Sequence, residues 1–394
     1  MTLPLASPAE AGLCPERLAR LLDRLQEDVQ AKRLPGAVAL ISRRGKIGLF
    51  EALGAQDPAL GTPMARDSIF RIYSMTKPIV TLAAMMLVEQ GRMLLADPVG
   101  KYLPEFAKQQ VAHVLDGRIE LRPARQPMTV QDLMRHSAGM GYEYSGDSPV
   151  QRMYREHRLH QRVPGRTLAQ TMSILASLPL MDDPGTVGEY SYATDVLGYL
   201  IQTLSGQSLG SYLTQQVYEP LGMVDTGFFV PPADQGRLTQ ALGIDPDSGQ
   251  PVKLIDVMQA PPMESGGGGL VSTAMDYARF LQCMLNRGEF EGRRLLGSRT
   301  VDFMTADHLG ALPWRESLLE AGEGFGLGFA VRKERGITPV PGSPGMYYWS
   351  GMAGTTFFVD PSEELFAILM IQAPNQRGHY RQLFRTMVYA SLID

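Results

Sequence analysis

The sequence predicts an α+β fold: an antiparallel sheet built from both ends of the chain, flanked by helices, with a mainly helical domain inserted between them. Short strand-like runs occur near both termini, whereas the segments between them show helical periodicity and capping residues. Strands, then helices, then strands describe α+β rather than alternating βαβ units. The 394 residues suffice for one large or two interleaved domains, and 44% hydrophobic residues supply a large core.

The N-terminal elements are a helix and a hairpin. Residues 16–30 repeat leucine or valine at helical spacing, and Leu34-Pro35-Gly36 ends the predicted helix. Residues 38–42 and 47–53 are strand-like runs, and the Arg-Arg-Gly-Lys sequence between them is typical of a hairpin turn.

The C-terminal region predicts two or three further strands within residues 345–372 and a final helix over 380–392. The segments between the two ends that show helical periodicity are 76–93, 130–135, 168–176, 195–204, 209–218 and 273–285. We therefore assign residues 1–80 and 220–394 to a discontinuous sheet domain and residues 81–219 to a mainly helical domain. A cleft between the two is the natural place for an active site.

Composition and charge exclude several classes of protein. Lysine and arginine total 37 against 41 acidic residues, a formal net charge of −4, and they form no long run. We therefore expect neither nucleic acid nor a membrane surface as a partner. Cys14 and Cys283 are far apart, which predicts no disulfide framework and a cytoplasmic location. The first ten residues show no signal peptide, and the most apolar window, 79–88, is about half the ~20 residues of a membrane span.

Ser74 and Lys77 are the first candidates for chemistry. They stand three residues apart at the start of the most apolar helical pattern, so Ser74 Oγ and Lys77 Nζ come within hydrogen-bond reach. Burial of the ammonium lowers its pKa toward that of a useful base, and the helix N-terminus offers Ser74 free N–H groups. The alternative interpretation is an N-capping serine followed by a surface lysine.

Two aromatic segments are further candidates. Tyr190-Ser191-Tyr192 precedes the helix predicted over residues 195–204, and this local pattern by itself favours packing over catalysis. Trp349-Ser350-Gly351 lies on a C-terminal strand, where a small residue after an aromatic lets a substrate lie against the backbone. An edge-strand turn is the alternative there.

In this order, the three segments resemble the S-x-x-K, Y-x-N-like and K-T-G-like motifs of the serine β-lactamase and penicillin-binding-protein superfamily. The resemblance is closest to the family VIII carboxylesterases, which look like class C β-lactamases but hydrolyse simple esters. It extends over most of the chain, because five other stretches are also similar to the family: 95–104, 128–139, 219–223, 267–273 and 324–328. It implies a β-lactamase/transpeptidase-like fold.

The resemblance also implies roles for individual residues. Ser74 would be the nucleophile, and Lys77 and Tyr190 would together act as the general base that activates it. The backbone N–H groups of Ser74 and Met352 become the oxyanion hole. This leaves open whether Lys77 or Tyr190 holds the proton at rest.

The substrate-binding residues implied are Trp349, Gly351, Tyr142 and Tyr192. Two of them depart from the β-lactamase pattern, because Tyr192 stands where an Asn is usual and Trp349 stands where a Lys is usual. Two polar groups that hold a β-lactam are therefore missing. An aromatic at the third motif is common in family VIII esterases and suits an uncharged ester.

Three other patterns give weaker hypotheses. Gly206 to Gly210 matches the G-x-S-x-G of α/β-hydrolases, but a helical segment precedes it, so Ser208 is expected to cap a helix. A Ser-His-Asp triad would most plausibly use His136, whose position at a helix end is typical of a structural histidine. Ser265 to Gly269 lacks the G-K-[ST] of a P-loop and predicts a tight turn. No H-E-x-x-H cluster occurs, so we expect neither a metal nor another cofactor.

The sequence thus predicts a cytoplasmic serine carboxylesterase that hydrolyses short-chain, small-molecule esters through an acyl-Ser74 intermediate. The alternatives are a β-lactamase or D-alanyl peptidase and an acyltransferase on the same site. A catalytically inactive binding protein of this fold is the alternative from a different class.

Overall fold

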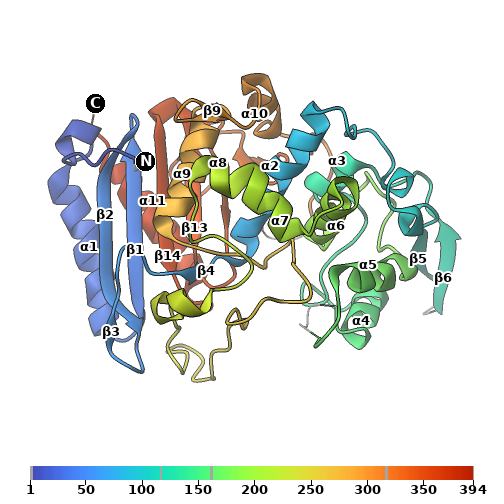
Figure 1. Cartoon of the computed structure of the whole chain (residues 1–394), viewed down its shortest axis with the longest axis horizontal. Coiled ribbons are helices and arrows are strands. Elements are labelled where there is room, and N and C mark those ends of the chain that lie inside the picture. Colours follow the sequence, from blue (N-terminus) through green and yellow to red (C-terminus); the bar gives the residue numbers. More distant parts are fainter. Residues whose placement is uncertain (1–2, 116–117, 160–162, 316–317, 394) are drawn as a thin grey trace.

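The computed structural model describes residues 3–115, 118–159, 163–315 and 318–393. Its centre is an eight-stranded antiparallel sheet with the strand order β10-β11-β12-β13-β14-β1-β2-β3 (Figure 1). These strands are β1 (Gly36–Arg43), β2 (Lys46–Asp57), β3 (Thr62–Pro63), β10 (Glu323–Phe325), β11 (Ala330–Arg332), β12 (Tyr347–Ser350), β13 (Thr356–Asp360) and β14 (Leu365–Ile371). Because β1 pairs with both β2 and β14, the two ends of the chain form one sheet. The predicted fold class is confirmed.

Alternating side chains of the central strands serve two separate cores. Ala39 and Ile41 of β1 face a layer made by α1 (Pro15–Gln30) and α11 (Arg377–Ala390). Val38 and Leu40 face the opposite layer, which contains α2 (Thr76–Glu89) and α9 (Ala274–Leu285). A strand buried on both faces needs apolar side chains at successive positions, which is what β1 and β14 supply.

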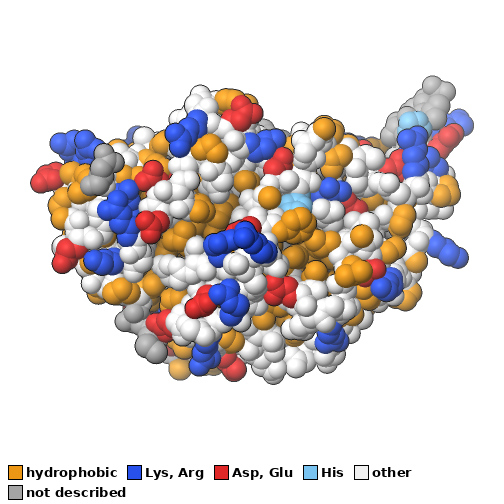
Figure 2. Space-filling model, turned by 90° about the horizontal axis from the view of Figure 1, so that it is seen from above, with side chains coloured by type: hydrophobic (Ala, Val, Ile, Leu, Met, Phe, Trp, Pro, Cys, Tyr) orange, Lys and Arg blue, Asp and Glu red, His pale blue; other side chains and the backbone are white. Residues whose placement is uncertain are grey.

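The middle of the chain is mainly helical; α3 to α6 lie on the right in Figure 1 with a hairpin at the far end, whereas α7 and α8 cross the centre toward α9. Its elements are β5 (Gln110–Leu115), β6 (Arg118–Pro123), α3 (Val130–Met134), α4 (Pro149–Glu156), α5 (Leu168–Ser177), α6 (Ala193–Ser205), α7 (Leu209–Leu213), a π-helical turn (Thr214–Tyr218) and α8 (Glu219–Leu221). The hairpin projects from that end of the molecule, as the side chains in Figure 2 also show. The helices predicted at residues 130–135, 168–176, 195–204 and 209–218 are confirmed within a few residues.

Short elements complete the chain. The strands among them are β4 (Phe70–Arg71), β7 (Val271–Ser272), β8 (Glu289–Phe290) and β9 (Arg293–Arg294), and α10 covers Ser298–Met304. The 3₁₀ helices are η1 (Ala9–Ala11), η2 (Tyr73–Met75), η3 (Val99–Lys101), η4 (Pro104–Phe106), η6 (Pro232–Arg237) and η7 (Pro361–Glu363). In the part of the chain that the structure describes, no helix combines the length and hydrophobicity that a bilayer crossing requires.

The helix α2 positions the candidate site. Twelve of its residues are buried, from Thr76 to Leu87, so it is a core helix that is apolar on nearly every side. It ends at Glu89, four residues before the predicted end at Met93, because the apolar pattern gives way to Glu89-Gln90-Gly91. The η2 turn that precedes α2 contacts β12, and this contact brings the first and third motifs together.

Candidate active site

Ser74 lies in η2, directly before α2. The preceding residue, Tyr73, has a φ of +44°, a left-handed conformation that is costly for a bulky residue. The surroundings hold it there, because the Tyr73 hydroxyl accepts a hydrogen bond from the N–H of Ile255 at 2.9 Å and Ile72 N donates to Leu270 O at 3.0 Å. The strained turn therefore presents Ser74 at the N-terminus of a buried helix.

Lys77 is almost completely buried, with 1% of its surface exposed. Its ammonium lies 2.7 Å from Gly267 O, 3.1 Å from the Tyr142 hydroxyl and 3.5 Å from Ser74 Oγ. An ammonium has three N–H donors, so these three acceptors satisfy it. The predicted proximity of Ser74 and Lys77 is present, and burial fixes the ammonium in one position.

The glycine-rich loop at residues 265–269 holds Lys77 from the opposite side. Ser265 Oγ donates to Asp195 Oδ1 at 2.6 Å, and Gly267 N donates to the same oxygen at 3.1 Å. A side chain at Gly267 would place its Cβ 2.4 Å from Asp195 Oδ2, so only glycine allows this approach to α6. The predicted tight turn is confirmed, because Gly269 N donates to Ser265 O at 3.0 Å. The turn presents the Gly267 carbonyl to the lysine.

Tyr190 lies between Lys77 and the third motif. Lys77 Nζ is 4.2 Å from the centroid of the Tyr190 ring, a cation–π contact. The indole N–H of Trp349 donates to the Tyr190 hydroxyl at 3.3 Å. The three predicted motifs therefore meet around this phenol, which is 6% exposed.

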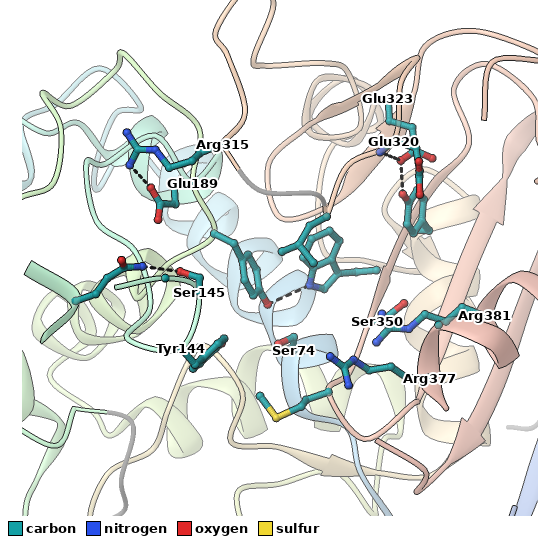
Figure 3. Close-up of a pocket in the computed structure, with 18 of the residues that line it drawn as sticks. Ser74, Tyr144, Ser145, Glu189, Arg315, Glu320, Glu323, Ser350, Arg377 and Arg381 are labelled. Atoms are coloured by element: carbon teal, nitrogen blue, oxygen red, sulfur yellow. Dashed lines mark hydrogen bonds and ion pairs between the residues drawn. The ribbon is translucent and has the colours of Figure 1, made fainter. Parts of the chain in front are cut away.

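A cavity of about 1010 Å³ opens beside these residues. Ser74, Tyr190, Trp349 and Met352 are among the residues that line it, so each of the three predicted motifs contributes a residue to one cavity. Figure 3 shows Arg315 with Glu189 on one side of Ser74 and Arg377 with Arg381 on the other. Such a volume is typical of a site for a small molecule.

Tyr142 and Tyr192 are placed behind the cavity wall rather than in it. The Tyr142 hydroxyl accepts from Lys77, and the Tyr192 hydroxyl donates to Glu143 Oε2 at 2.5 Å. Burial raises the pKa of both phenols, and the Glu143 carboxylate raises that of Tyr192 further. Neither tyrosine is among the residues that line the cavity, so a direct contact of either with the substrate stays a prediction. Their rings pack edge to face, with centroids 4.5 Å apart.

Gly351 is also turned away from the cavity, whereas Met352 lines it. A Cβ at Gly351 would lie 2.5 Å from Ile72 O and 2.3 Å from Thr355 Oγ1. Glycine therefore lets the end of β12 pack against the turn that carries Ser74. Gly351 N donates to Thr355 O at 2.7 Å, which fixes the start of the Gly351–Met352 segment.

The competing sequence hypotheses fall outside this arrangement. Ser208 caps α7 by accepting from Ser211 N at 3.2 Å, as predicted. Among the residues that the structure describes, no group of His, Cys, Asp and Glu is placed to hold a metal ion.

His136 is closer to the site than its sequence position indicated. It follows α3, is 1% exposed, and its ring centroid lies 4.9 Å from that of Tyr190. Burial, reinforced by the Lys77 charge, holds the pKa of its imidazole well below the usual value, so the ring is neutral at neutral pH. Its Nδ1 lies 3.3 Å from Ser191 Oγ.

Comparison with known proteins identifies the family. The sequence profile of the family described as Beta-lactamase matches residues 20–388. The chain belongs to the beta-lactamase family. The resemblance drawn from the three motifs is thereby confirmed.

Relatives of this beta-lactamase-family protein include enzymes. Protein Rv1367c of Mycobacterium tuberculosis is 36% identical over 363 residues, 88% of each chain. Esterase EstB of Burkholderia gladioli is 30% identical, and the match covers 99% of this chain and 100% of EstB. Among solved structures, EstCE1, "a hydrolase with promiscuous acyltransferase activity", matches with a TM-score of 0.78 at 27% identity, over 95% of this chain and 99% of its own. This family membership and these relatives identify the protein as a serine hydrolase.

Proposed function

We propose that this serine hydrolase is a carboxylesterase of the family VIII type that acts on short-chain esters through an acyl-Ser74 intermediate. The observation that carries the proposal is the position of Trp349. Its indole lines the cavity and donates to the Tyr190 hydroxyl, so an aromatic surface stands where β-lactamases use a lysine to bind the substrate's charge. The 30% identity to EstB along the full chain supports the same choice. The cytoplasmic location belongs to this proposal as well.

The proposed reaction follows from the positions of the side chains. Ser74 Oγ attacks the ester carbonyl carbon, and its proton passes to Tyr190 or Lys77. The N–H groups of Ser74 and Met352 stabilise the oxyanion of the tetrahedral intermediate. Collapse releases the alcohol, which takes the proton from the same base, and leaves acyl-Ser74. A water molecule then attacks the acyl carbon, loses its proton to that base, and releases the acid as Ser74 regains its hydrogen.

The buried residues behind the cavity serve this reaction by holding Lys77. Gly267 O and the Tyr142 hydroxyl accept from the ammonium, and Asp195 holds the glycine loop that supplies the carbonyl. In this proposal Tyr142 and Tyr192 position the lysine and its neighbours, and Trp349 contacts the substrate.

A substrate panel tests the proposal. Purified protein is assayed with p-nitrophenyl esters of increasing acyl length, a chromogenic cephalosporin and a D-alanyl dipeptide. We expect rapid turnover of the short esters and little of the other two. Strong turnover of the cephalosporin or the dipeptide would contradict the assignment.

A labelling experiment tests the nucleophile. A serine-directed phosphonate should modify the peptide that contains Ser74, and the adduct should disappear in Ser74→Ala. Ser208→Ala is the matched control: it should label normally and retain its kcat. Loss of its helix cap should lower the free energy of unfolding by ~0.5–2 kcal/mol. An adduct on Ser208 detected by peptide mass spectrometry would overturn the mechanism.

Acyl transfer to an alcohol is a second candidate. EstCE1 is described as having promiscuous acyltransferase activity, and the cavity of about 1010 Å³ has room for an acyl group and an acceptor together. Adding a primary alcohol during ester turnover distinguishes the two, because a transferase forms a new ester in proportion to alcohol concentration.

A further inference from the structure

The peptide group between Gly351 and Met352 carries two functions at once. Its N–H, on Met352, is the proposed oxyanion donor, and its carbonyl, on Gly351, points the opposite way because the peptide group is planar and trans. That carbonyl accepts two hydrogen bonds, one from Gly354 N at 3.1 Å and one from Arg381 Nη2 at 2.6 Å.

Arg381 makes the shorter and the only charged of these two contacts. It projects from α11 toward the end of β12, beside Arg377, and both line the cavity (Figure 3). A bond from a guanidinium is charge-assisted and roughly twice as strong as one between neutral groups. Burial and the neighbouring Arg377 lower the pKa of Arg381 to about 10, so the group stays charged at neutral pH.

A donor at the carbonyl changes the N–H of the same peptide group. Hydrogen bonds arranged in a chain polarise one another, and each strengthens the next by roughly 10–30%. A guanidinium at Gly351 O draws electron density toward that oxygen and leaves the Met352 N–H a better donor. The same bond also fixes the direction of the N–H, and oxyanion stabilisation depends on donors that are oriented before the reaction.

The opposite end of this segment is already fixed. Gly351 N donates to Thr355 O at 2.7 Å, and the Gly351 Cα packs against the Ile72 carbonyl. The Gly351–Met352 peptide group can still rotate about the single bonds on either side of it. The hydrogen bond from Arg381 to the Gly351 carbonyl limits this rotation.

We propose that Arg381 is a positioning residue for the oxyanion hole, which it orients and polarises through the Gly351 carbonyl. The proposal rests on the assignment of Ser74 as nucleophile and of Met352 N–H as oxyanion donor. Arg381, on the last helix of the chain, would thus affect the transition state indirectly, through the Gly351–Met352 peptide group.

The experiment compares Arg381→Gln and Arg381→Lys with wild type on an uncharged p-nitrophenyl ester. We expect Arg381→Gln to lower kcat by about 10–100-fold with little change in KM, below the ~10²–10³-fold of removing an oxyanion donor. Arg381→Lys keeps a charged donor and should recover part of the loss. An aryl boronic acid, which forms a tetrahedral adduct with the serine, should bind Arg381→Gln more weakly by a similar factor.

Arg385→Gln is the matched control. Arg385 lies one turn further along α11, also lines the cavity, and stacks over the Tyr348 ring at 4.2 Å. Its replacement removes the same charge from the same helix and should lower kcat much less than Arg381→Gln. Equal losses in the two variants, a loss confined to KM, or unchanged boronate affinity in folded Arg381→Gln would overturn the proposal.

Failure of this inference is distinguishable from failure of the proposed function. If Ser74 is not the nucleophile, wild type does not label at Ser74, and Ser74→Ala still binds the boronate. If only the role of Arg381 is wrong, wild type and Arg381→Gln label and bind the boronate equally. If circular dichroism shows that Arg381→Gln is unfolded, the boronate affinity of Arg381→Lys tests the proposal instead. Lysine lacks the planar guanidinium, so Arg381→Lys should bind the boronate more weakly than wild type.

Discussion

The phenol of Tyr190 is the residue on which the proposed proton transfer depends. Replacing Tyr190 by Phe keeps the ring contacts with His136 and Trp349 and removes only the oxygen that accepts from the indole. We expect a folded protein whose turnover falls by ~10²–10⁴-fold, the range for loss of a general base. The measurement is kcat/KM with a short-chain p-nitrophenyl ester, with circular dichroism as the check on folding.

Tyr192→Phe is the control for that experiment. Its hydroxyl donates to Glu143 and does not face the cavity, so its loss should change turnover far less. Near-wild-type turnover by folded Tyr190→Phe would show that the tyrosine only packs, and Lys77 alone would then be the base.

For individual residues, the sequence predicts the local contact between Ser74 and Lys77 but not the distant partners of Lys77. The spacing of Ser74 and Lys77 on one helix start is local, so their proximity could be predicted. The other partners of Lys77 are distant in sequence: Gly267 lies 190 residues away and Tyr142 lies 65 residues away. Nothing in a single sequence places a carbonyl or a phenol at such separations, so the contact of Tyr142 with Lys77 could not be predicted.

The loop at residues 265–269 is the element that connects α6 to the site. We expect Gly267→Ala to displace the loop, because the new Cβ would lie 2.4 Å from Asp195 Oδ2 and 3.0 Å from the Tyr142 hydroxyl. The shift moves the carbonyl that holds Lys77, so kcat should fall by about 10–100-fold, as small displacements in active sites do. Overpacking of this kind also costs about 1–3 kcal/mol of stability.

Gly243→Ala provides a control with the same change of side chain. No atom lies within 4 Å of a Cβ built at Gly243, so this variant should keep both its kcat and its midpoint in urea. If Gly267→Ala retains full activity, the loop does not position the lysine.

The elements that the sequence did not predict are short or exposed. In β6 of the β5–β6 hairpin, Ile119 and Leu121 alternate with charged residues, but both side chains are exposed. A six-residue alternation without a buried face is a weak strand signal in a polar segment. Helix α4 was missed although Ser148-Pro149 and Gln151 form a capping box, because only eight residues follow the cap. By contrast, α1, β1 and β14 bury continuous apolar faces, and their positions were predicted within a few residues.

At the scale of the whole molecule, His136 lies where the helical region meets the sheet. Its ring contacts Tyr190 on one side and Phe325 of β10 on the other, with centroids 4.9 and 5.3 Å apart. Its backbone carbonyl accepts from Glu189 N at 2.8 Å. A charge at this junction would be buried beside the Lys77 ammonium, so protonation of His136 works against the folded state.

The expected result is a loss of stability on mild acidification that depends on His136. The folded-state pKa of His136 is lowered, so between that value and the unfolded value of ~6.5 the unfolded chain binds more protons. The contribution of neutral His136 to the free energy of unfolding is therefore fully present above about pH 6.5 and decreases as the pH falls below that value. Asp276 has the opposite pH dependence, because burial raises the pKa of its carboxyl to about 6. The stabilisation from its protonated form is lost as the pH rises through that value. Urea unfolding at pH 7.5 and 5.0 separates the two: His136→Gln should show a smaller fall, or a rise, in the free energy of unfolding between these pH values, whereas the exposed-site control His113→Gln should follow wild type. The same fall in His136→Gln as in wild type would show that His136 does not set the acid sensitivity of the junction.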